Sequence, residues 1–275
     1  MAENNALMQL TNVTKVFARG SVDEIKALDQ VRLPIYNEDF ITVIGSNGAG
    51  KTTLLNIIAG IFPPERGGYI TINGKDITTL SEHKRAKYIG RVYQDPHIGT
   101  AAKMTIEENL SLALLRGQSR GLSVATNKQR RQQFRSALAQ LGLGLEDRLN
   151  TPVGTLSGGQ RQALALMMAT ISKPALLLLD EHIATLDPNT ARIVLELSEL
   201  IIKREKMTTM MVTHNMEIAL RYGNRLIMMH KGRIIVDLNQ QQRSNLAVND
   251  LVTAFERASG EQFADDSILL TTPDI

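Results

Sequence analysis

Short apolar runs alternate with helix signals along much of the chain. Three runs bounded by turn or polar residues predict buried parallel strands, at residues 40–44 (FITVI), 175–179 (ALLLL) and 207–212 (MTTMMV). Gly60 and two prolines mark the end of a helix after the first run, Asp187-Pro188 the start of a second helix, and Asn215 the cap of a third. The repeated order of strand, loop and helix predicts an α/β fold around a parallel sheet.

Other segments depart from this order. The N-terminal part, to about residue 92, includes a strand pattern at 69–72 followed by a hairpin signal, Asn73-Gly74, which predicts an antiparallel β subdomain. Residues 95–168 favour helix, with an amphipathic pattern over 126–141, and we expect an inserted helical subdomain there. A second hairpin is expected at 225–230 and 233–238. We therefore divide the chain into a main domain, 1–240, and a C-terminal extension, 241–275, that is helical over 248–258.

Composition narrows the class of protein. The chain has 275 residues, of which 43% are hydrophobic and 21% charged, as in folded globular proteins. Its longest apolar runs fall far short of the ~18 residues that cross a bilayer, and no secretory signal is visible at the N-terminus. The absence of cysteine excludes disulfides and thiolate metal sites and fits a cytosolic protein. The net charge of +3 is small. The basic stretch 128–135 is interpreted as a solvated helix face rather than a site for nucleic acid or an anionic membrane surface.

The first apolar run leads directly into a phosphate-loop motif. GSNGAGKTT at residues 45–53 matches G-x-x-x-x-G-K-[ST] between a strand and a helix. Glycines allow the backbone N–H groups to turn toward phosphate oxygens, Lys51 reaches the β- and γ-phosphates, and Thr52 offers a hydroxyl to Mg²⁺. A glycine-rich turn without function is the weaker interpretation. The predicted nucleotide-binding residues are Gly45, Ser46, Asn47, Gly48, Ala49, Gly50, Lys51, Thr52 and Thr53.

Two acids follow the second apolar run, at the end of LLLLDE. A carboxylate at the carboxyl end of a parallel strand lies at the sheet edge where the phosphate loop also lies, so Asp180 is expected to hold Mg²⁺. Glu181 follows on a turning backbone and is expected to orient and deprotonate the attacking water. A strand end that meets solvent also explains an acid pair, but the phosphate loop favours the catalytic interpretation.

A third motif, LSGGQ at residues 156–160, opens a helix-favouring stretch. Ser157 is placed to cap that helix, and Gly158 and Gly159 permit close approach of the backbone to an anion. The phosphate loop is already one anion-binding helix end, so a second suggests a nucleotide contact made from another subunit. Asp180 and Glu181 with the phosphate loop alone would also fit a kinase, a GTPase or a helicase, and this motif counts against those classes.

With these motifs in this order, the chain resembles the ATP-binding subunit of an ABC transporter over residues 7–240. The resemblance implies a P-loop NTPase (RecA-like) core that binds ATP and Mg²⁺. It also implies a head-to-tail dimer in which Ser157, Gly158, Gly159 and Gln160 of one subunit close on the ATP held by the other.

The resemblance assigns roles to four further residues. Phe17 resembles the aromatic that stacks on adenine, although a core phenylalanine remains the alternative. Gln94 matches the glutamine that contacts Mg²⁺ and the attacking water. Asp187 matches the acid that communicates across the dimer and is also an ordinary helix cap. His214 follows the strand at 207–212 and resembles the histidine that contacts the γ-phosphate, which a neutral imidazole can do by donating a hydrogen bond.

The neighbouring His182 is not expected to take part in the chemistry. It stands one residue beyond Glu181, in LLLLDEHIATLDP, and is expected to point away from the γ-phosphate. Its expected role is local packing or hydrogen bonding.

The leading hypothesis is an ATPase that powers a transporter at the cytoplasmic face of the inner membrane. It implies separate membrane permease subunits, a second ATP-binding subunit in a homodimer, and an extracytoplasmic substrate-binding protein, with no direct nucleic-acid contact. Segments such as MTIEENL (104–110) and MVTHNMEIAL (211–220) most resemble bacterial importer ATPases for amino acids, including aromatic ones. The alternatives are a soluble ABC ATPase that acts on nucleic acid or ribosomes, and a P-loop kinase or GTPase.

Overall fold

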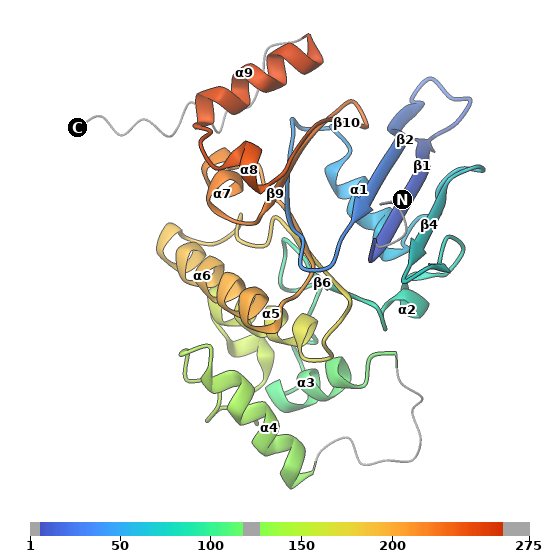
Figure 1. The fold of residues 1–275 in the computed structure, drawn as a ribbon. Coiled ribbons are helices and arrows are strands. Elements are labelled where there is room, and N and C mark those ends of the chain that lie inside the picture. Colours follow the sequence, from blue (N-terminus) through green and yellow to red (C-terminus); the bar gives the residue numbers. More distant parts are fainter. Residues whose placement is uncertain (1–5, 118–126, 261–275) are drawn as a thin grey trace. The chain divides into compact units, whose positions relative to one another are not determined.

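The computed structural model describes residues 6–117 and 127–260, which form two compact units (Figure 1). The first unit combines residues 6–82 with 208–260, and the second contains the described residues between 83 and 207. The helix α2 (Glu82–Arg85) runs across the boundary between them along the chain. The C-terminal residues beyond 260 lie outside the described part.

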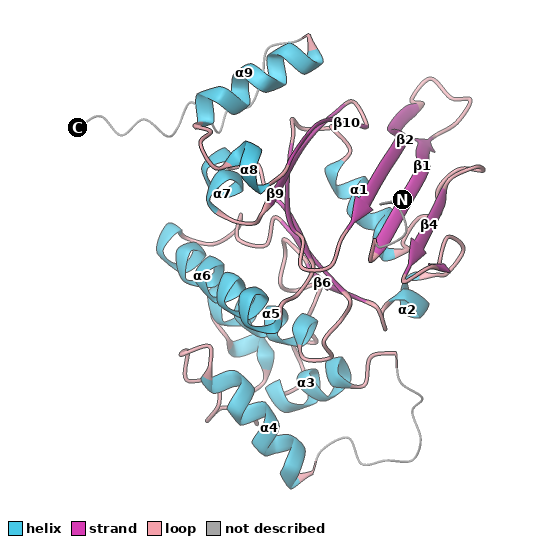
Figure 2. Ribbon diagram, in the orientation of Figure 1, coloured by secondary structure: helices cyan, strands magenta, loops and turns pink. Residues whose placement is uncertain are grey.

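The first unit contains an antiparallel sheet and four strands of a mixed sheet (Figure 2). The antiparallel sheet has the order β2-β1-β4-β5, and in the other sheet β3 lies between β8 and β9, parallel to both, while β10 pairs antiparallel with β9. The strands are β1 (Met8–Phe17), β2 (Ile25–Ile35), β3 (Phe40–Ile44), β4 (Tyr69–Ile72), β5 (Lys75–Asp76), β8 (Thr209–Val212), β9 (Arg225–His230) and β10 (Arg233–Leu238). The helices are α1 (Lys51–Ala59), α7 (Met216–Arg221), α8 (Gln240–Arg243) and α9 (Val248–Ser259).

The second unit contains a parallel strand pair and several helices. The strands β6 (Ile89–Val92) and β7 (Leu176–Asp180) are paired in parallel, and all five residues of β7 are buried. The helices are α3 (Ile106–Leu114), α4 (Lys128–Ala139), the short 3-10 helix η2 (Val153–Thr155), α5 (Gly158–Thr170) and α6 (Pro188–Glu205). Residues 118–126 lie outside the described part, so the beginning of the amphipathic helix predicted at 126 is not described.

The strand and helix signals of the sequence are confirmed in both units. The helix α1 ends at Gly60, which adopts a left-handed conformation with φ 88°. Asp187 and Asn215 cap α6 and α7, and α9 covers the helix expected at 248–258. The turn between β4 and β5 has positive φ at Asn73 (49°) and Gly74 (72°), which a two-residue hairpin turn requires.

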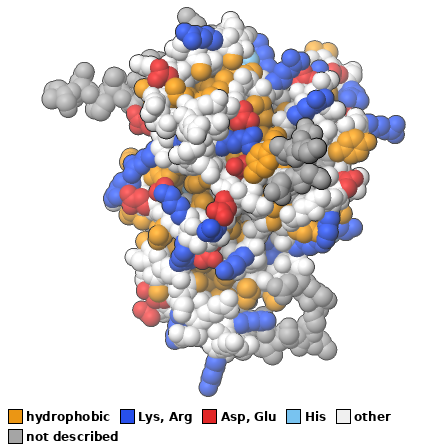
Figure 3. Space-filling model, viewed as in Figure 1, with side chains coloured by type: hydrophobic (Ala, Val, Ile, Leu, Met, Phe, Trp, Pro, Cys, Tyr) orange, Lys and Arg blue, Asp and Glu red, His pale blue; other side chains and the backbone are white. Residues whose placement is uncertain are grey.

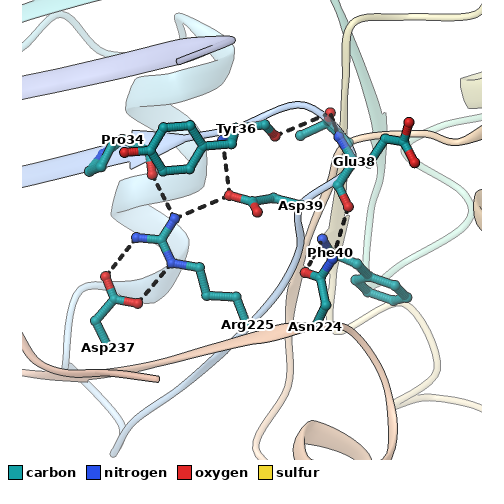
Figure 4. A network of polar contacts seen from close by, with 9 residues as sticks. Pro34, Tyr36, Glu38, Asp39, Phe40, Asn224, Arg225 and Asp237 are labelled. Atoms are coloured by element: carbon teal, nitrogen blue, oxygen red, sulfur yellow. Dashed lines mark hydrogen bonds and ion pairs between the residues drawn. The ribbon is translucent and has the colours of Figure 1, made fainter. Parts of the chain in front are cut away.

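Polar contacts at the beginning of β3 hold this strand in register with β9 (Figure 4). The Arg225 guanidinium binds both carboxylate oxygens of Asp237, at 2.8 and 2.6 Å, and its Nη1 donates to Asp39 Oδ2 at 3.1 Å and to the Pro34 carbonyl at 2.8 Å. The hydrogen bonds to Asp237 raise the pKa of Arg225. Asn224 Oδ1 accepts from Phe40 N at 2.8 Å. This network anchors the strand that leads into the phosphate loop.

Candidate functional site

The phosphate loop follows β3 in a conformation that requires glycine at two of its positions. Gly45 and Gly50 have φ of 154° and 99°. A Cβ at Gly45 would lie 2.2 Å from the Met229 carbonyl oxygen, and one at Gly50 would lie 2.4 Å from the Ala27 carbonyl oxygen. Real Cβ atoms do not approach backbone oxygens so closely, so alanine at either position would displace the loop.

The loop ends at the N-terminus of α1, which has the features of an anion-binding helix end. The helix begins at Lys51 and has no acidic residue in its first turn, so its N-terminal N–H groups and its dipole favour a negative ligand. Lys51 is 7% exposed, and its Nζ donates to the carbonyl oxygens of Gly45 and Ser46, the latter at 3.2 Å. Its charge is therefore held over the loop. Thr52 is exposed at the start of the helix.

Adjacent parallel strands place His214 at the same sheet edge as the phosphate loop. Val43 of β3 pairs with Val212 of β8, and Gly45 and His214 each lie two residues beyond that pair. The Thr213 N–H donates to the Val43 carbonyl at 3.1 Å, which extends the pairing toward His214. The half-buried His214 is followed by Asn215, which caps α7. The first unit thus brings these two predicted elements together.

Phe17 lies at the end of β1 and packs against an aromatic that the sequence analysis missed. Its ring is 5.3 Å from that of Phe62 at an interplanar angle of 81°, an edge-to-face contact. Lys15 Nζ lies 5.5 and 5.6 Å from the two ring centroids. Phe17 is half-buried rather than part of the buried core. Stacking of Phe17 on adenine stays a prediction. Phe62 is a neighbour of Phe17 that no motif spacing would have revealed.

In the second unit, Asp180 ends β7 and Glu181 begins the turn that follows. Asp180 is 7% exposed. Glu181 has φ 45°, a left-handed conformation that is uncommon for a residue other than glycine and is found at functional sites. The Ala184 N–H donates to the Glu181 carbonyl at 2.9 Å and closes the turn. The backbone therefore departs from the strand conformation at Glu181, directly after Asp180.

Asp180 also has a charged partner that the sequence analysis missed. Arg91 Nη2 lies 2.6 Å from Asp180 Oδ2, and the two side chains are only 9% and 10% exposed. The register of β6 and β7 pairs Arg91 with Leu178, and Asp180 lies two residues further, so both charged side chains point to the same face. The Arg91 guanidinium also lies 4.6 Å from the Tyr93 ring. Predicting this ion pair requires the register of segments that are far apart in sequence.

Gln94 lies just beyond β6, and its backbone is tied to neighbouring segments. Its side chain is exposed, its carbonyl accepts from Thr185 Oγ1 at 3.4 Å, and the preceding Tyr93 carbonyl accepts from Gln162 Nε2 at 3.1 Å. The structure thus places Gln94 in the unit that also carries Asp180 and Glu181. Its contact with Mg²⁺ and water stays a prediction.

The LSGGQ motif forms the start of α5, as expected. Ser157 and Gln160 make a capping box in which Ser157 Oγ accepts from Gln160 N and Gln160 Oε1 accepts from Ser157 N, both at 3.3 Å. Ser157 and Gly158 are exposed, whereas Gly159 is buried, and a Cβ there would lie 2.1 Å from Thr190 Cγ2. Gly159 therefore allows α5 to pack closely against α6, a requirement that the motif alone did not reveal.

Asp187 caps the helix that follows the acid pair. Its Oδ1 accepts from Thr190 N at 3.1 Å, and hydrogen bonding with Thr190 lowers the pKa of the Asp187 carboxyl. The carboxylate is exposed. The helix-cap interpretation is confirmed, while communication with a second subunit stays a prediction.

His182 is buried, with a serine hydroxyl beside its ring. It is 1% exposed, and burial lowers its pKa to about 4, so the ring is neutral at physiological pH. Its Nε2 lies 3.1 Å from Ser198 Oγ in α6. Ser198 Oγ in turn donates to the Val194 carbonyl at 2.7 Å, so the imidazole Nε2–H is the donor to Ser198. The expected role in packing and hydrogen bonding is confirmed.

The oxygen donors available for Mg²⁺ suit that ion. A hydroxyl, an amide oxygen and a carboxylate, from Thr52, Gln94 and Asp180, are hard ligands, and Mg²⁺ needs few protein ligands when phosphates and water complete its shell. Among the described residues, no group of three or more histidine, cysteine, aspartate or glutamate side chains is placed to hold a metal.

On the face shown in Figure 3, lysine and arginine side chains are interspersed with acidic and uncharged ones. None of the helices in residues 6–117 and 127–260 is long and apolar enough to cross a membrane.

Comparison with known proteins identifies the chain's relatives. A family model described as ABC transporter matches residues 28–184. The tyrosine transport ATP-binding protein of Clostridioides difficile (strain R20291) is 41% identical over 252 residues, which are 92% of this chain and 100% of that protein. The methionine import ATP-binding protein MetN of Escherichia coli (strain K12) is 32% identical over 232 residues, which are 83% of this chain and 64% of that protein.

A solved structure agrees with these sequence similarities. It is a dimeric ATP-binding cassette in a post-hydrolysis state, bound to ADP and Pi. It superposes with a TM-score of 0.72 at 29% identity and covers 85% of this chain and 98% of its own. The α/β P-loop fold expected from the sequence is thereby confirmed.

Proposed function

The chain belongs to the ABC transporter family of ATP-binding proteins, and on that premise we propose that it powers the uptake of an amino acid, with tyrosine as the leading cargo. The family's activity is ATP hydrolysis coupled to transport, and this chain is such an ATPase. The similarities support this function and not an ATPase that acts on nucleic acid or ribosomes. The geometry that carries the proposal is the phosphate loop, where Gly45 and Gly50 shape an anion-binding helix end under Lys51.

The cargo proposal rests on the relative that this chain matches over that relative's whole length. A tyrosine transport ATP-binding protein aligns with 92% of this chain, and a methionine import protein aligns with 83%. Both handle amino acids, and the higher identity lies with the aromatic one.

The proposed assembly has two copies of this chain on membrane permease subunits. In a head-to-tail dimer, Ser157, Gly158, Gly159 and Gln160 of one copy would face the nucleotide held by the phosphate loop of the other. The capping box at Ser157 fixes the start of this helix, and Ser157 and Gly158 are exposed, which supports that role. An extracytoplasmic substrate-binding protein would deliver the amino acid. The ATPase would then lie at the cytoplasmic face of the inner membrane.

Within each site, the chain's residues would divide the work of hydrolysis. Thr52, Gln94 and Asp180 would hold Mg²⁺, which when bound neutralises charge on the β- and γ-phosphates. Lys51 and the loop N–H groups would bind the same phosphates, and Phe17 would stack on adenine. Asp187 would face the partner subunit while it caps α6.

The bond-breaking step would use the residues at the strand ends. Glu181 would accept a proton as a water oxygen attacks the γ-phosphorus and the bond to the bridging oxygen of ADP breaks. His214, as a neutral imidazole, would donate a hydrogen bond to the γ-phosphate. The products are ADP and phosphate.

Reconstitution with the co-purified permease tests the cargo. We would reconstitute the ATPase and its permease in proteoliposomes, with ATP on the side of the ATPase and the substrate-binding protein on the opposite side. ATP-driven uptake of tyrosine, phenylalanine and methionine would then be compared. Uptake of tyrosine that depends on ATP and is not displaced by excess methionine is the expected result. Preferential uptake of methionine, or of a solute that is not an amino acid, would overturn the cargo assignment while leaving the ATPase assignment intact.

A further inference from the structure

The C-terminal segment that follows β10 contains a buried guanidinium. Arg243 of α8 is 5% exposed, and its Nη2 donates to the carbonyl oxygens of Ala219 at 2.8 Å, Leu220 at 2.5 Å and Tyr222 at 2.7 Å. These carbonyls lie in the last turn of α7 and just beyond it, where a helix lacks N–H groups of its own to satisfy them. A cation is also the favoured charge at a helix C-terminus. Arg243 therefore serves as the C-terminal cap of α7.

The Ala219 carbonyl links this cap to the strand of the phosphate loop. It accepts a second hydrogen bond from Thr42 Oγ1 at 3.0 Å, and both Thr42 and Arg243 are buried. Thr42 lies in β3, two residues before the end of that strand. The C-terminal segment and β3 thus bind the same backbone oxygen.

The other end of α7 begins directly after His214. Asn215 caps the helix through its side chain, which accepts from Ile218 N at 2.9 Å, and its backbone carbonyl accepts from Ala219 N at 3.0 Å. The Asn215 N–H donates to Thr213 Oγ1 at 3.1 Å. The residue after His214 is therefore hydrogen-bonded to Ala219, the residue that Arg243 holds.

The helix α9 covers the same region with apolar contacts. Leu251 and Phe255 are 0% and 1% exposed and belong to a buried cluster with Met216 and Ala219 of α7 and Leu226 and Met228 of β9. Figure 1 shows α7, α8 and α9 next to β9. The C-terminal segment accordingly holds α7 both by hydrogen bonds and by packing.

We propose that Arg243 is a positioning residue for ATP hydrolysis, which fixes α7 against β3 and thereby fixes His214 at the edge of the phosphate loop. The proposal rests on the role proposed above for His214. It gives the C-terminal segment a part in turnover beyond covering apolar surface. If the His214 imidazole shifts by about 1 Å from its position beside the γ-phosphate, the rate of hydrolysis should fall far more than the affinity for ATP. The effect should therefore fall on kcat and not on KM, because the phosphate loop and Phe17 carry the binding.

The test compares Arg243→Gln with Arg257→Gln in the full chain. Both substitutions remove one arginine charge from the C-terminal segment, but Arg257 is exposed on α9. For Arg243→Gln we expect kcat to fall at least about tenfold, with KM for ATP within about twofold, and the His214 imidazole NMR resonances to shift or broaden. Arg243→Lys should recover part of kcat, and Arg257→Gln should change neither quantity. A kcat for Arg243→Gln within twofold of that for Arg257→Gln, measured well below the melting temperature, would overturn the proposal.

His214→Ala separates this proposal from the one on which it rests. If His214→Ala abolishes turnover while Arg243→Gln retains it, the positioning role of Arg243 is wrong and the role of His214 stands. If His214→Ala turns over normally, both are wrong. Should Arg243→Gln fail to fold, Arg243→Lys decides: a kcat below half of wild type with perturbed His214 resonances supports the proposal, and wild-type values for both overturn it.

Discussion

The His182 imidazole donates its Nε2–H to Ser198 Oγ at 3.1 Å, and this bond ties the turn after Glu181 to α6 from inside the second unit. His182 follows the proposed base in sequence, yet it is fully enclosed and neutral. The side chain of His182 therefore lies in the protein interior, although the residue follows Glu181 directly in the sequence. His182 and Ser198 are sixteen residues apart in sequence. They meet because α6 packs against the turn that follows β7.

His182→Ala should lower stability more than turnover. The substitution removes a buried hydrogen bond and leaves a cavity, which together cost about 2–3 kcal/mol of unfolding free energy. ATPase turnover at 20 °C should stay within a few-fold of wild type. Urea unfolding and a coupled ATPase assay measure the two effects, with Ser198→Ala as the control that removes the same bond from the other side. A loss of turnover of several orders of magnitude would show that His182 takes part in the reaction.

The buried imidazole should also make stability depend on pH. Burial lowers the pKa of His182 from 6.5 to about 4, so the unfolded chain binds a proton there at a higher pH than the folded chain does. The folded state therefore keeps its full stability above pH 6.5. It loses stability as the pH falls toward about 4, because protonation of His182 favours the unfolded chain. Lowering the pH from 7.5 to 5 should thus cost about 2 kcal/mol from this residue alone. Urea unfolding of wild type and His182→Gln at both pH values isolates it, and equal pH dependence of the two proteins would contradict the burial argument.

Glu181→Gln should separate ATP binding from hydrolysis. The amide keeps the shape of the side chain but cannot accept the water proton, so turnover should fall by about three orders of magnitude or more while ATP still binds. Gel filtration with ATP should show a trapped dimer. Glu196→Gln is the matched control, because Glu196 is an exposed partner of Arg192 on α6. Normal hydrolysis by Glu181→Gln would remove Glu181 from the mechanism.

The buried pair of Arg91 and Asp180 should show strong coupling in stability. Arg91→Met leaves the Asp180 carboxylate without this partner at 2.6 Å in a nearly buried position, and we expect a loss of about 3 kcal/mol of unfolding free energy. In a double-mutant cycle with Asp180→Asn, the second substitution should recover part of that loss, because no buried charge then lacks its partner. Denaturant unfolding of the four proteins gives the coupling. Additive effects of the two substitutions would show that the ion pair contributes little.

Gly45→Ala should strongly weaken nucleotide binding at the phosphate loop. The new Cβ would collide with the Met229 carbonyl oxygen, so the loop must move and ATP affinity should fall by at least about 100-fold, or about 3 kcal/mol. Gly20→Ala is the control: Gly20 also has positive φ, at 77°, but nothing lies within 4 Å of the added atom. That variant should lose about 1 kcal/mol of stability and bind ATP normally. Fluorescent-nucleotide titration compares them, and wild-type affinity of Gly45→Ala would contradict the steric argument.

The site residues that could be predicted belong to continuous motifs. The phosphate loop, the acid pair, LSGGQ and the caps at Asp187 and Asn215 each combine a strand or helix signal with fixed local spacing, and local backbone geometry follows from such patterns. The strand β3 occupies the predicted residues, and β7 is shifted by a single position from 175–179 to Leu176–Asp180. The placement of His214 could also be expected, because parallel strands present their carboxyl ends at one edge.

By itself, then, the sequence determined the fold class, the order of elements and the chemical groups available for binding a triphosphate. Tertiary structure alone decided which distant side chains support those groups. Arg91 pairs with Asp180, Ser198 is hydrogen-bonded to His182, Phe62 packs against Phe17, and Arg243 donates to the carbonyl groups at the end of α7. The physical reason is that motifs encode local backbone geometry, whereas these contacts depend on strand register and helix packing between segments that are not neighbours in the chain. A guanidinium or a hydroxyl has no distinctive spacing in sequence, and it gains its role only from what lies within hydrogen-bonding distance.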